Sequence, residues 1–178
     1  IGQSSCTDAS AGYYVDSTAA TSQTACLSGT YNPNTASTSS SDCTDADAGY
    51  YTSSAGSASQ IACAAGTYQP STGQTSCTDA DAGYYVSTTA ATSQTACLAG
   101  TYNPNTASSS SSDCVDASAG YYPSSAGSGS QTACAAGTYQ PSTAQSSCID
   151  ASAGYYVDTT AATSQTACPA GTYNPNTG

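Results

Sequence analysis

The chain contains no Lys, Arg, His, Met, Trp or Phe, and each of its 11 acidic residues is Asp. A surface without cations cannot neutralise phosphates, so we expect no nucleic-acid partner. For the same reason it has nothing with which to attract anionic lipid. No apolar run approaches the ~20 residues that span a bilayer, so we also expect no membrane insertion.

Large aliphatic residues are scarce too, because Leu, Ile and Val together number nine of the 178 residues. Such a composition cannot supply a conventional hydrophobic core. Ser and Thr make up a third of the residues. Taken alone, these features predict an unfolded, mucin-like segment. The chain also has ten cysteines, and disulfides can replace a missing core in a small extracellular module.

The cysteines recur at separations of 20, 17, 20 and 14 residues, which gives a long period of 71 residues with half-repeats of 37 and 34. A period of this size is typical of linear repeat arrays. We therefore divide the chain into the end of a preceding repeat (1–5), repeat 1 (6–76), repeat 2 (77–147) and a partial repeat 3 (148–178). No linker interrupts the period, so we expect one continuous rod without separate domains.

Short strands and turns are the expected local structures, and no helix is expected. Asn32-Pro33-Asn34 and Gln69-Pro70-Ser71 are turn signals, and Gly residues stand before the tyrosines, where positive φ is common. Apolar residues show neither a sustained alternation nor a 3.6-residue stripe. The predicted fold class is a small disulfide-rich, mostly β/irregular protein, built as a linear array of short β-hairpin-like, Cys-rich modules.

Disulfides are the expected use of the cysteines, because His is absent and no two cysteines have the close spacing of a zinc site. The spacing allows two pairing registers. One pairs cysteines across each Gly-Thr-Tyr segment and leaves Cys6 and Cys168 for adjacent repeats: Cys26–Cys43, Cys63–Cys77, Cys97–Cys114 and Cys134–Cys148. The other uses all ten: Cys6–Cys26, Cys43–Cys63, Cys77–Cys97, Cys114–Cys134 and Cys148–Cys168.

The segment from Cys63 through Gly66 and Tyr68 to Cys77 resembles the ephrin-receptor-like cysteine-rich repeat. It is also similar to the single-disulfide module of tumour-necrosis-factor receptors, and the segment Cys134–Cys148 shares the pattern. The resemblance implies the first register, the one across Gly-Thr-Tyr. The chain departs from the family where a second cysteine of a Cys-x-x-Cys pair is replaced by alanine, at Ala9, Ala46, Ala80, Ala117 and Ala151.

The 15 tyrosines lie almost entirely in Gly-Tyr-Tyr or Gly-Thr-Tyr segments. We expect one ring of each segment to pack on Pro, Gly and the disulfide of the next unit. The residues assigned to this packing are Tyr14, Tyr31, Tyr51, Tyr68, Tyr85, Tyr102, Tyr122 and Tyr139. The alternative interpretation is a ladder of rings that stack on sugars.

The strings Asp45-Ala-Asp47-Ala-Gly49 and Asp79-Ala-Asp81-Ala-Gly83 have the first two acidic positions of a calcium loop. The full loop also needs further oxygen ligands and a distal Glu, and Glu is absent. Turn formation by Asp is the alternative interpretation. Calcium is therefore only a candidate ligand of these four carboxylates, and we expect no other metal or cofactor.

Tracts of Ser and Thr are typical of dense O-glycosylation, and we expect covalent glycans on this chain. The candidate sites lie in the Ser-rich tracts and the Thr-Ala-Ala-Thr segments: Thr18, Ser37, Thr38, Ser39, Ser40, Thr89, Ser108, Ser109, Ser110, Ser111 and Thr160.

No enzymatic activity is expected, because His, Glu and Lys, the usual general acids and bases, are all absent. The sequence favours a structural subunit of an extracellular, O-glycosylated filament or cell-surface appendage such as a flagellar hair, whose main partner is itself. One alternative is the rigid stalk of a cell-surface receptor or adhesin. Another is a carbohydrate-binding array of tyrosines.

Overall fold

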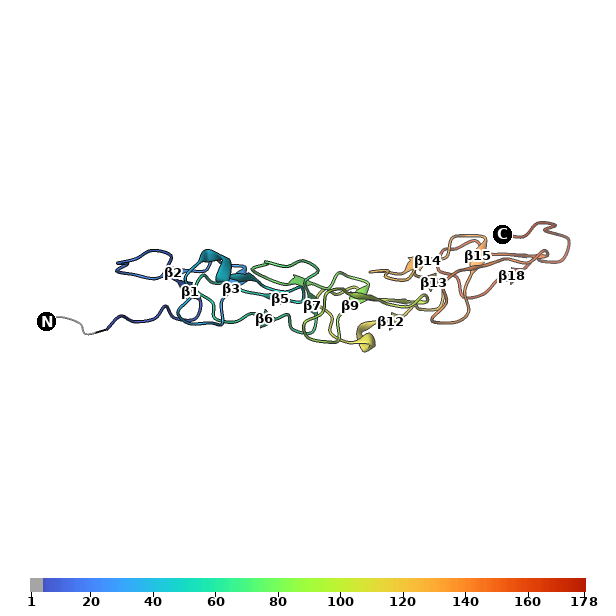
Figure 1. Ribbon diagram of the computed structural model, residues 1–178. Helices are drawn as coiled ribbons and strands as arrows, with labels where there is room; N and C mark the ends of the chain where they lie inside the picture. The colour runs from blue at the N-terminus through green and yellow to red at the C-terminus, as the bar shows by residue number, and fades with distance from the viewer. Residues whose placement is uncertain (1–4) are drawn as a thin grey trace. The chain divides into compact units, whose positions relative to one another are not determined.

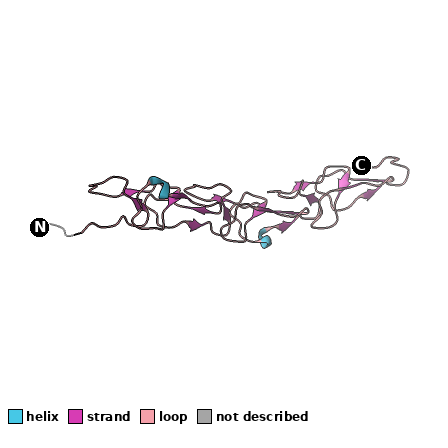
Figure 2. Cartoon of the chain, viewed as in Figure 1, coloured by secondary structure: helices cyan, strands magenta, loops and turns pink. Residues whose placement is uncertain are grey.

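The computed structural model describes residues 5–178, so the expected end of a preceding repeat, residues 1–5, lies outside the described residues except for Ser5. Its regular structure consists of two-residue strands joined in antiparallel pairs, each between neighbours in sequence. Figures 1 and 2 show these hairpins following one another along a chain that is mostly loop and turn. The predicted disulfide-rich, mostly β/irregular array of hairpin modules is confirmed.

The described residues fall into two compact units. The first holds the chain through Asp79 together with Thr88–Ser93, and the second holds Ala80–Ser87 and Gln94–Gly178. Strands of the first unit are β1 (Tyr13–Tyr14), β2 (Thr24–Ala25), β3 (Thr30–Tyr31), β4 (Thr44–Asp45), β5 (Tyr50–Tyr51), β6 (Ile61–Ala62), β7 (Thr67–Tyr68) and β8 (Thr78–Asp79). The second unit contains β9 (Tyr84–Tyr85), β10 (Thr95–Ala96), β11 (Thr101–Tyr102), β12 (Val115–Asp116), β13 (Tyr121–Tyr122), β14 (Thr132–Ala133), β15 (Thr138–Tyr139), β16 (Ile149–Asp150), β17 (Tyr155–Tyr156) and β18 (Thr166–Ala167).

Two kinds of hairpin alternate along the chain. Tyr-Tyr hairpins, such as β1–β2, pair Tyr13 with Ala25 and Tyr14 with Thr24. Thr-Tyr hairpins, such as β3–β4, pair Thr30 with Asp45. The same register recurs in each later hairpin of its kind. The 71-residue sequence period is therefore four hairpins, two of each kind.

Two single-turn 3-10 helices, η1 (Ser40–Asp42) and η2 (Ser111–Asp113), correct the expectation that the chain has no helix. They lie in the Ser-rich tracts that lengthen the loops of hairpins β3–β4 and β11–β12. A capping box starts η1: the Ser39 hydroxyl accepts a hydrogen bond from the Ser41 amide, and the Asp42 carboxylate accepts one from the Ser39 amide. These side chains satisfy the amides that a helix start leaves unpaired.

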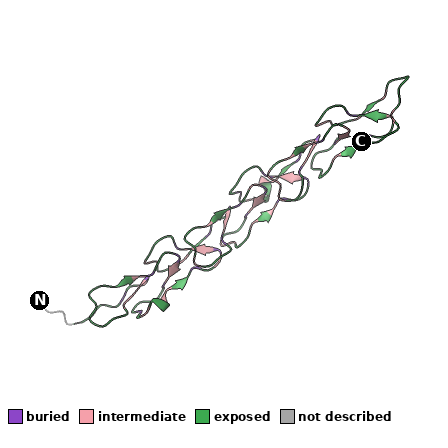
Figure 3. Cartoon of the chain, turned by 90° about the horizontal axis from the view of Figure 1, so that it is seen from above, coloured by how far each residue is buried: buried purple, intermediate pink, exposed green. Residues whose placement is uncertain are grey.

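The buried residues are small, and they lie in short stretches along the chain (Figure 3). The most buried positions hold Ala, Cys, Asn, Thr and Pro, and Val86 is the most buried large aliphatic residue of the described chain. Each of the eight tyrosines predicted to pack is only half-buried. The centre of each module is therefore backbone, methyl groups and sulfur, and the rings lie over it.

Candidate functional site

Four disulfides join cysteines across each Gly-Thr-Tyr segment: Cys26–Cys43, Cys63–Cys77, Cys97–Cys114 and Cys134–Cys148. This is the register that the family resemblance implied. Their Cα–Cα distances are 5.6–5.8 Å, within the usual range for a disulfide. The alternative register does not occur, because Cys26 already pairs with Cys43 rather than with Cys6.

The geometry of the hairpins explains why the cysteines pair in this register. In each bridge one cysteine directly follows the second strand of a hairpin, and the other directly precedes the second strand of the next hairpin. Cys63, for example, follows β6 and Cys77 precedes β8. Each disulfide therefore joins two successive modules as well as closing the base of one.

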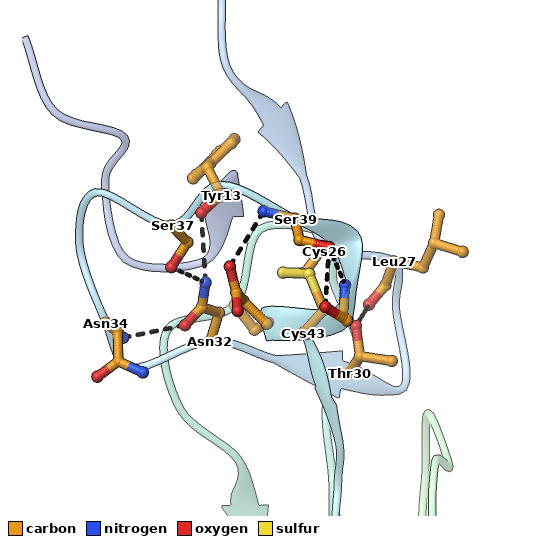
Figure 4. The surroundings of a disulfide bond; sticks show 12 residues. Tyr13, Cys26, Leu27, Thr30, Asn32, Asn34, Ser37, Ser39 and Cys43 are labelled. Carbon is orange, nitrogen blue, oxygen red and sulfur yellow. Dashed lines mark hydrogen bonds between the residues drawn. A yellow bond between two sulfur atoms is a disulfide. The ribbon is translucent and has the colours of Figure 1, made fainter. Parts of the chain in front are cut away.

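Each of the two long Thr-Tyr hairpins contains a buried Asn, and Figure 4 shows the first of them, Asn32. Asn32 is 0 % exposed, and its amide nitrogen donates to the Ser37 hydroxyl at 2.8 Å and to the Tyr13 carbonyl at 3.3 Å. Its amide oxygen accepts from the Asn34 backbone at 3.0 Å. Asn103 repeats all three bonds. Within residues 5–178 no buried side-chain nitrogen or oxygen lacks a partner.

Successive modules are joined by one backbone contact that recurs nine times. A residue with positive φ lies at the end of each loop, and we call these the loop-tip residues: Ala36, Gly56, Gly73, Ala90, Ala107, Gly127, Ala144, Ala161 and Gly178. We call their acceptors, which are all buried, the junction residues: Ala9, Cys26, Ala46, Cys63, Ala80, Cys97, Ala117, Cys134 and Ala151. In that order, each loop-tip amide donates to one junction carbonyl at 2.8–3.0 Å.

Seven of the nine loop tips also cover a glycine two modules earlier, and Gly83 shows why no other residue fits there. Its φ is +90°, and a Cβ atom at this position would clash with the carbonyl oxygen of Gly127. The Tyr84 ring lies against Gly127 in turn, since its hydroxyl would be 2.8 Å from a Cβ on that glycine. Gly12, Tyr13 and Gly56 repeat the arrangement in the first unit. Tyr13 and Tyr84 were not among the tyrosines predicted to pack.

The alanines that replace the family's second cysteine are junction residues, equivalent to the cysteines that open the bridges. Ala46 directly follows β4 as Cys63 follows β6, and Gln60 directly precedes β6 as Cys77 precedes β8. Gln60 closes its hairpin without sulfur: its amide oxygen accepts from the Asp47 backbone and its amide nitrogen donates to the Asp47 carboxylate, both at 2.7 Å. Disulfide-closed and glutamine-closed hairpins thus alternate.

The other Tyr-Tyr hairpins have the same closure. Gln94 makes the same two bonds to Asp81. Gln131 and Gln165 bond the backbone and, at 3.4–3.5 Å, the hydroxyl of Ser118 and Ser152. Gln23 bonds the backbone of Ser10. Sequence reasoning missed these glutamines, although each follows a junction alanine at the separation at which Cys77 follows Cys63.

The carboxylates considered for calcium are dispersed. Asp47 and Asp81 bind Gln60 and Gln94, while Asp45 and Asp79 lie in strands β4 and β8 and are exposed. Within the part of the chain that the structure describes, no three Asp or Cys side chains converge to hold a metal ion. Asp47 and Asp81 therefore have a role in hairpin closure.

The hydroxyls considered for glycans divide into three groups by exposure. Ser37 and Ser108 are buried, and both accept a hydrogen bond from a buried Asn, so their hydroxyls are not open to a glycan in this structure. Ser39 and Ser110 are half-buried caps of the 3-10 helices. The remaining candidates are exposed: Thr18, Thr38, Ser40, Thr89, Ser109, Ser111 and Thr160.

Two cysteines of the described chain are free: Cys6, which is exposed, and Cys168, which is half-buried. Helices long and apolar enough to cross a bilayer do not occur among residues 5–178. Four disulfides in a chain with so small a core are typical of an oxidising environment, as in secreted or extracellular proteins. The chain matches no protein-family model, and no curated protein shows significant similarity to it.

Proposed function

We propose that this chain is a structural subunit of an extracellular, O-glycosylated filament or surface appendage. The observation that carries the proposal is the junction contact: one backbone hydrogen bond, with the same donor and acceptor positions, repeats nine times. Further modules of the same sequence can be added to the array through the same hydrogen bond. Repeat proteins gain their stability from such nearest-neighbour terms.

The chemistry of the surface supports the same role. The 11 carboxylates have no cationic partner, so they repel one another and favour an extended, hydrated molecule. Exposed hydroxyls on the equivalent loops of successive periods, such as Thr18, Thr89 and Thr160, offer evenly repeated positions for sugar. Sugar at these positions would cover the edges of the hairpins, which are otherwise free to pair with other chains.

Electron microscopy of the native material tests the proposal. Fibres whose axial repeat corresponds to one 71-residue period, and which lose their order on reduction, are the expected result. Isolated single rods that end in a separate domain would instead favour the stalk of a receptor or adhesin. A mass equal to that of the bare 17.3 kDa chain would remove the glycan from the proposal.

A further inference from the structure

Both leucines of the chain occupy the same position of the repeat, and both are exposed. Leu27 follows Cys26 and is 76 % exposed, and Leu98 follows Cys97 and is 77 % exposed. Complete hairpins precede and follow Leu98 in the described chain, so its exposure is a property of the repeat itself. A chain with only nine large aliphatic residues thus leaves both of its leucines in water.

The fold does not require a leucine at this position. Ala64 stands at the equivalent place in the next disulfide-closed hairpin, directly after Cys63. The Leu27 carbonyl accepts hydrogen bonds from the Thr30 amide at 3.1 Å and the Thr30 hydroxyl at 2.8 Å. The Ala64 carbonyl accepts the same two bonds from Thr67, at 3.0 and 2.9 Å. Because alanine builds the same turn, the leucine side chain is available for a contact outside the chain.

Leu27 borders a small hollow in the surface of the first unit. The hollow has a volume of about 240 Å³, and Tyr14 and the Cys26–Cys43 disulfide lie on its other sides. Figure 4 shows Leu27 near both of these cysteines. Sites that hold drug-sized ligands have about 300–1,000 Å³, so this hollow has room for a single side chain.

Two carboxylates flank the hollow. Asp42 lies between Ser40 and Cys43 in the sequence, and both of these residues line the hollow. Asp45 is exposed and pairs with Thr30, another lining residue, in the antiparallel register of β3 and β4. Directly opposite residues of such a pair share one face of the hairpin, which places Asp45 on the side of the hollow.

The second period repeats this surface without a change of sequence. All eight residues that line the hollow have identical equivalents 71 positions later, among them Tyr85 and Leu98. Asp113 and Asp116 are the equivalents of Asp42 and Asp45. We call each set of a tyrosine, a leucine and two carboxylates a leucine site, and each unit contains one.

The charge of the chain decides which partner suits a leucine site. A second copy would bring its own 11 carboxylates and no Lys or Arg, and like charges brought together at an interface cost free energy. A complementary group combines an apolar stem, for the leucine and the tyrosine, with a positive charge for the carboxylates. The side chains of arginine and lysine have this construction.

We propose that each leucine site binds an arginine or lysine side chain of a second, basic protein. The aliphatic stem of the bound side chain lies against Leu27 and Tyr14, and its cationic end meets Asp42 and Asp45. The Tyr14 ring adds a cation–π attraction. The inference goes beyond the proposed function, because it assigns a partner other than the chain itself and holds for a filament subunit and a stalk alike.

The test uses the two leucines as reporters, since isotope-labelled leucine methyl groups give NMR signals from Leu27 and Leu98 alone. The probe is the peptide acetyl-Gly-Gly-Arg-Gly-Gly-amide. Both sets of methyl signals are expected to shift and to saturate at the same peptide concentration, and the apparent affinity should fall as salt is added. Methyl signals that do not move in low salt would overturn the inference.

Two further peptides separate the stem from the charge. Citrulline in place of arginine keeps the shape and removes the charge, whereas diaminobutyric acid keeps a positive charge on a shorter stem. Each is expected to bind several-fold more weakly than the arginine peptide. Equal binding of either peptide would contradict a site that needs both the stem and the charge.

A substitution in one site leaves the other site as an internal control. Asp45→Asn should weaken binding at Leu27 by about two- to five-fold, the range expected for an exposed ion pair, and leave binding at Leu98 unchanged. Asp79→Asn is the matched control, because Asp79 has the place of Asp45 in a hairpin with alanine at the leucine position. Equal losses from the two substitutions would overturn the inference.

Leu27→Ala removes the apolar side of the hollow, and the Thr30 amide then reports on the site. The fold should be retained, since the chain itself has Ala64 at the equivalent position. The shift of the Thr30 amide should fall several-fold, to the small shift expected of Thr67 beside Ala64. A wild-type shift at Thr67 as large as that at Thr30 would assign the binding to carboxylates alone. Methyl signals that change with protein concentration, without peptide, would assign the surface to a second copy, and either result would overturn the inference.

Discussion

Gln60 binds Asp47 through two hydrogen bonds of 2.7 Å at the position where the next hairpin has the Cys63–Cys77 disulfide. Two unrelated chemistries therefore close the same backbone geometry in neighbouring modules. The disulfide closure depends on the redox state of the surroundings, and the glutamine closure does not. This relationship explains why alanine replaces cysteine in every second module without loss of the hairpin.

The equivalence predicts that a new disulfide can be built. Ala46→Cys with Gln60→Cys, in a background with Cys6→Ser and Cys168→Ser, should form a bridge with the geometry of Cys63–Cys77. A loop of this length contributes about 3 kcal/mol in the chain-entropy model, and the loss of the two Gln60 bonds offsets roughly 1–2 kcal/mol of it.

The measurements are mass spectrometry for the bridge and thermal unfolding for the stability. Ala46→Cys alone is the control, and it should leave the unfolding temperature almost unchanged. Two alkylatable thiols in the folded double variant would mean that the two positions are not equivalent.

Gly83→Ala should destabilise the second unit more than Gly154→Ala does. Both residues have positive φ, near +90° and +84°, so both substitutions cost about 1–2 kcal/mol in backbone strain. Only at Gly83 does the new methyl group also meet the Gly127 carbonyl, and we expect at least about 2 kcal/mol more. Urea unfolding of the two variants as monomers measures the difference. Equal midpoints would show that the loop tip at Gly127 moves away from the methyl group without a cost in free energy.

Asn32→Ala should cost about 2–4 kcal/mol, because it leaves the Tyr13 carbonyl and the Ser37 hydroxyl buried without their donor. Asn34→Ala is the matched control: Asn34 is exposed and contributes only its backbone amide to the network. Hydrogen exchange of the Val15 amide, which donates to the Ser37 carbonyl, gives the local readout. Similar protection in both variants would refute a structural role for the Asn32 amide.

Glycan mapping of the native chain should find sugar on Thr38 and Ser40 and none on Ser37. The three residues lie within one loop, and they differ in exposure: Ser37 is 8 % exposed and bound to Asn32, while the other two are open. The second period gives an independent check, with Ser109 and Ser111 occupied and Ser108 bare. Sugar on Ser37 or Ser108 would require the Asn network to open.

Local signals in the sequence were enough to predict the hairpins and the 71-residue period. Gly-Tyr-Tyr, Gly-Thr-Tyr and the Pro-containing turns are short-range features, and the cysteine spacing sets which of them close. The 3-10 helix at Ser40 was missed, although Ser39 and Asp42 have the spacing of a capping box. Its signal lies inside a run of serines that composition alone assigns to a glycosylated loop.

The contacts between modules could not be predicted, because they are made by the backbone. The backbone amide of a loop-tip residue such as Ala90 donates to the Cys63 carbonyl. This hydrogen bond does not depend on the side chain of the loop-tip residue. The alternation of Gly73 and Ala144 at one structural position shows this tolerance. We therefore predicted that tyrosine, the largest residue of the chain, packs at the centre of each module. The structure has small junction residues such as Ala46 there.

The alternation of closures has a mechanical consequence. When the chain is pulled from its ends, a hairpin closed by sulfur cannot lengthen without breaking a covalent bond, whereas one closed by Gln60 or Gln94 needs only to lose hydrogen bonds. The glutamine-closed loops should yield first, and the 13-residue span between Asp47 and Gln60 would release roughly 40 Å of slack at full extension. Because the flanking disulfides keep the neighbouring modules from extending, the loop can close again once the force is removed. The disulfides thus limit how far the chain can be stretched.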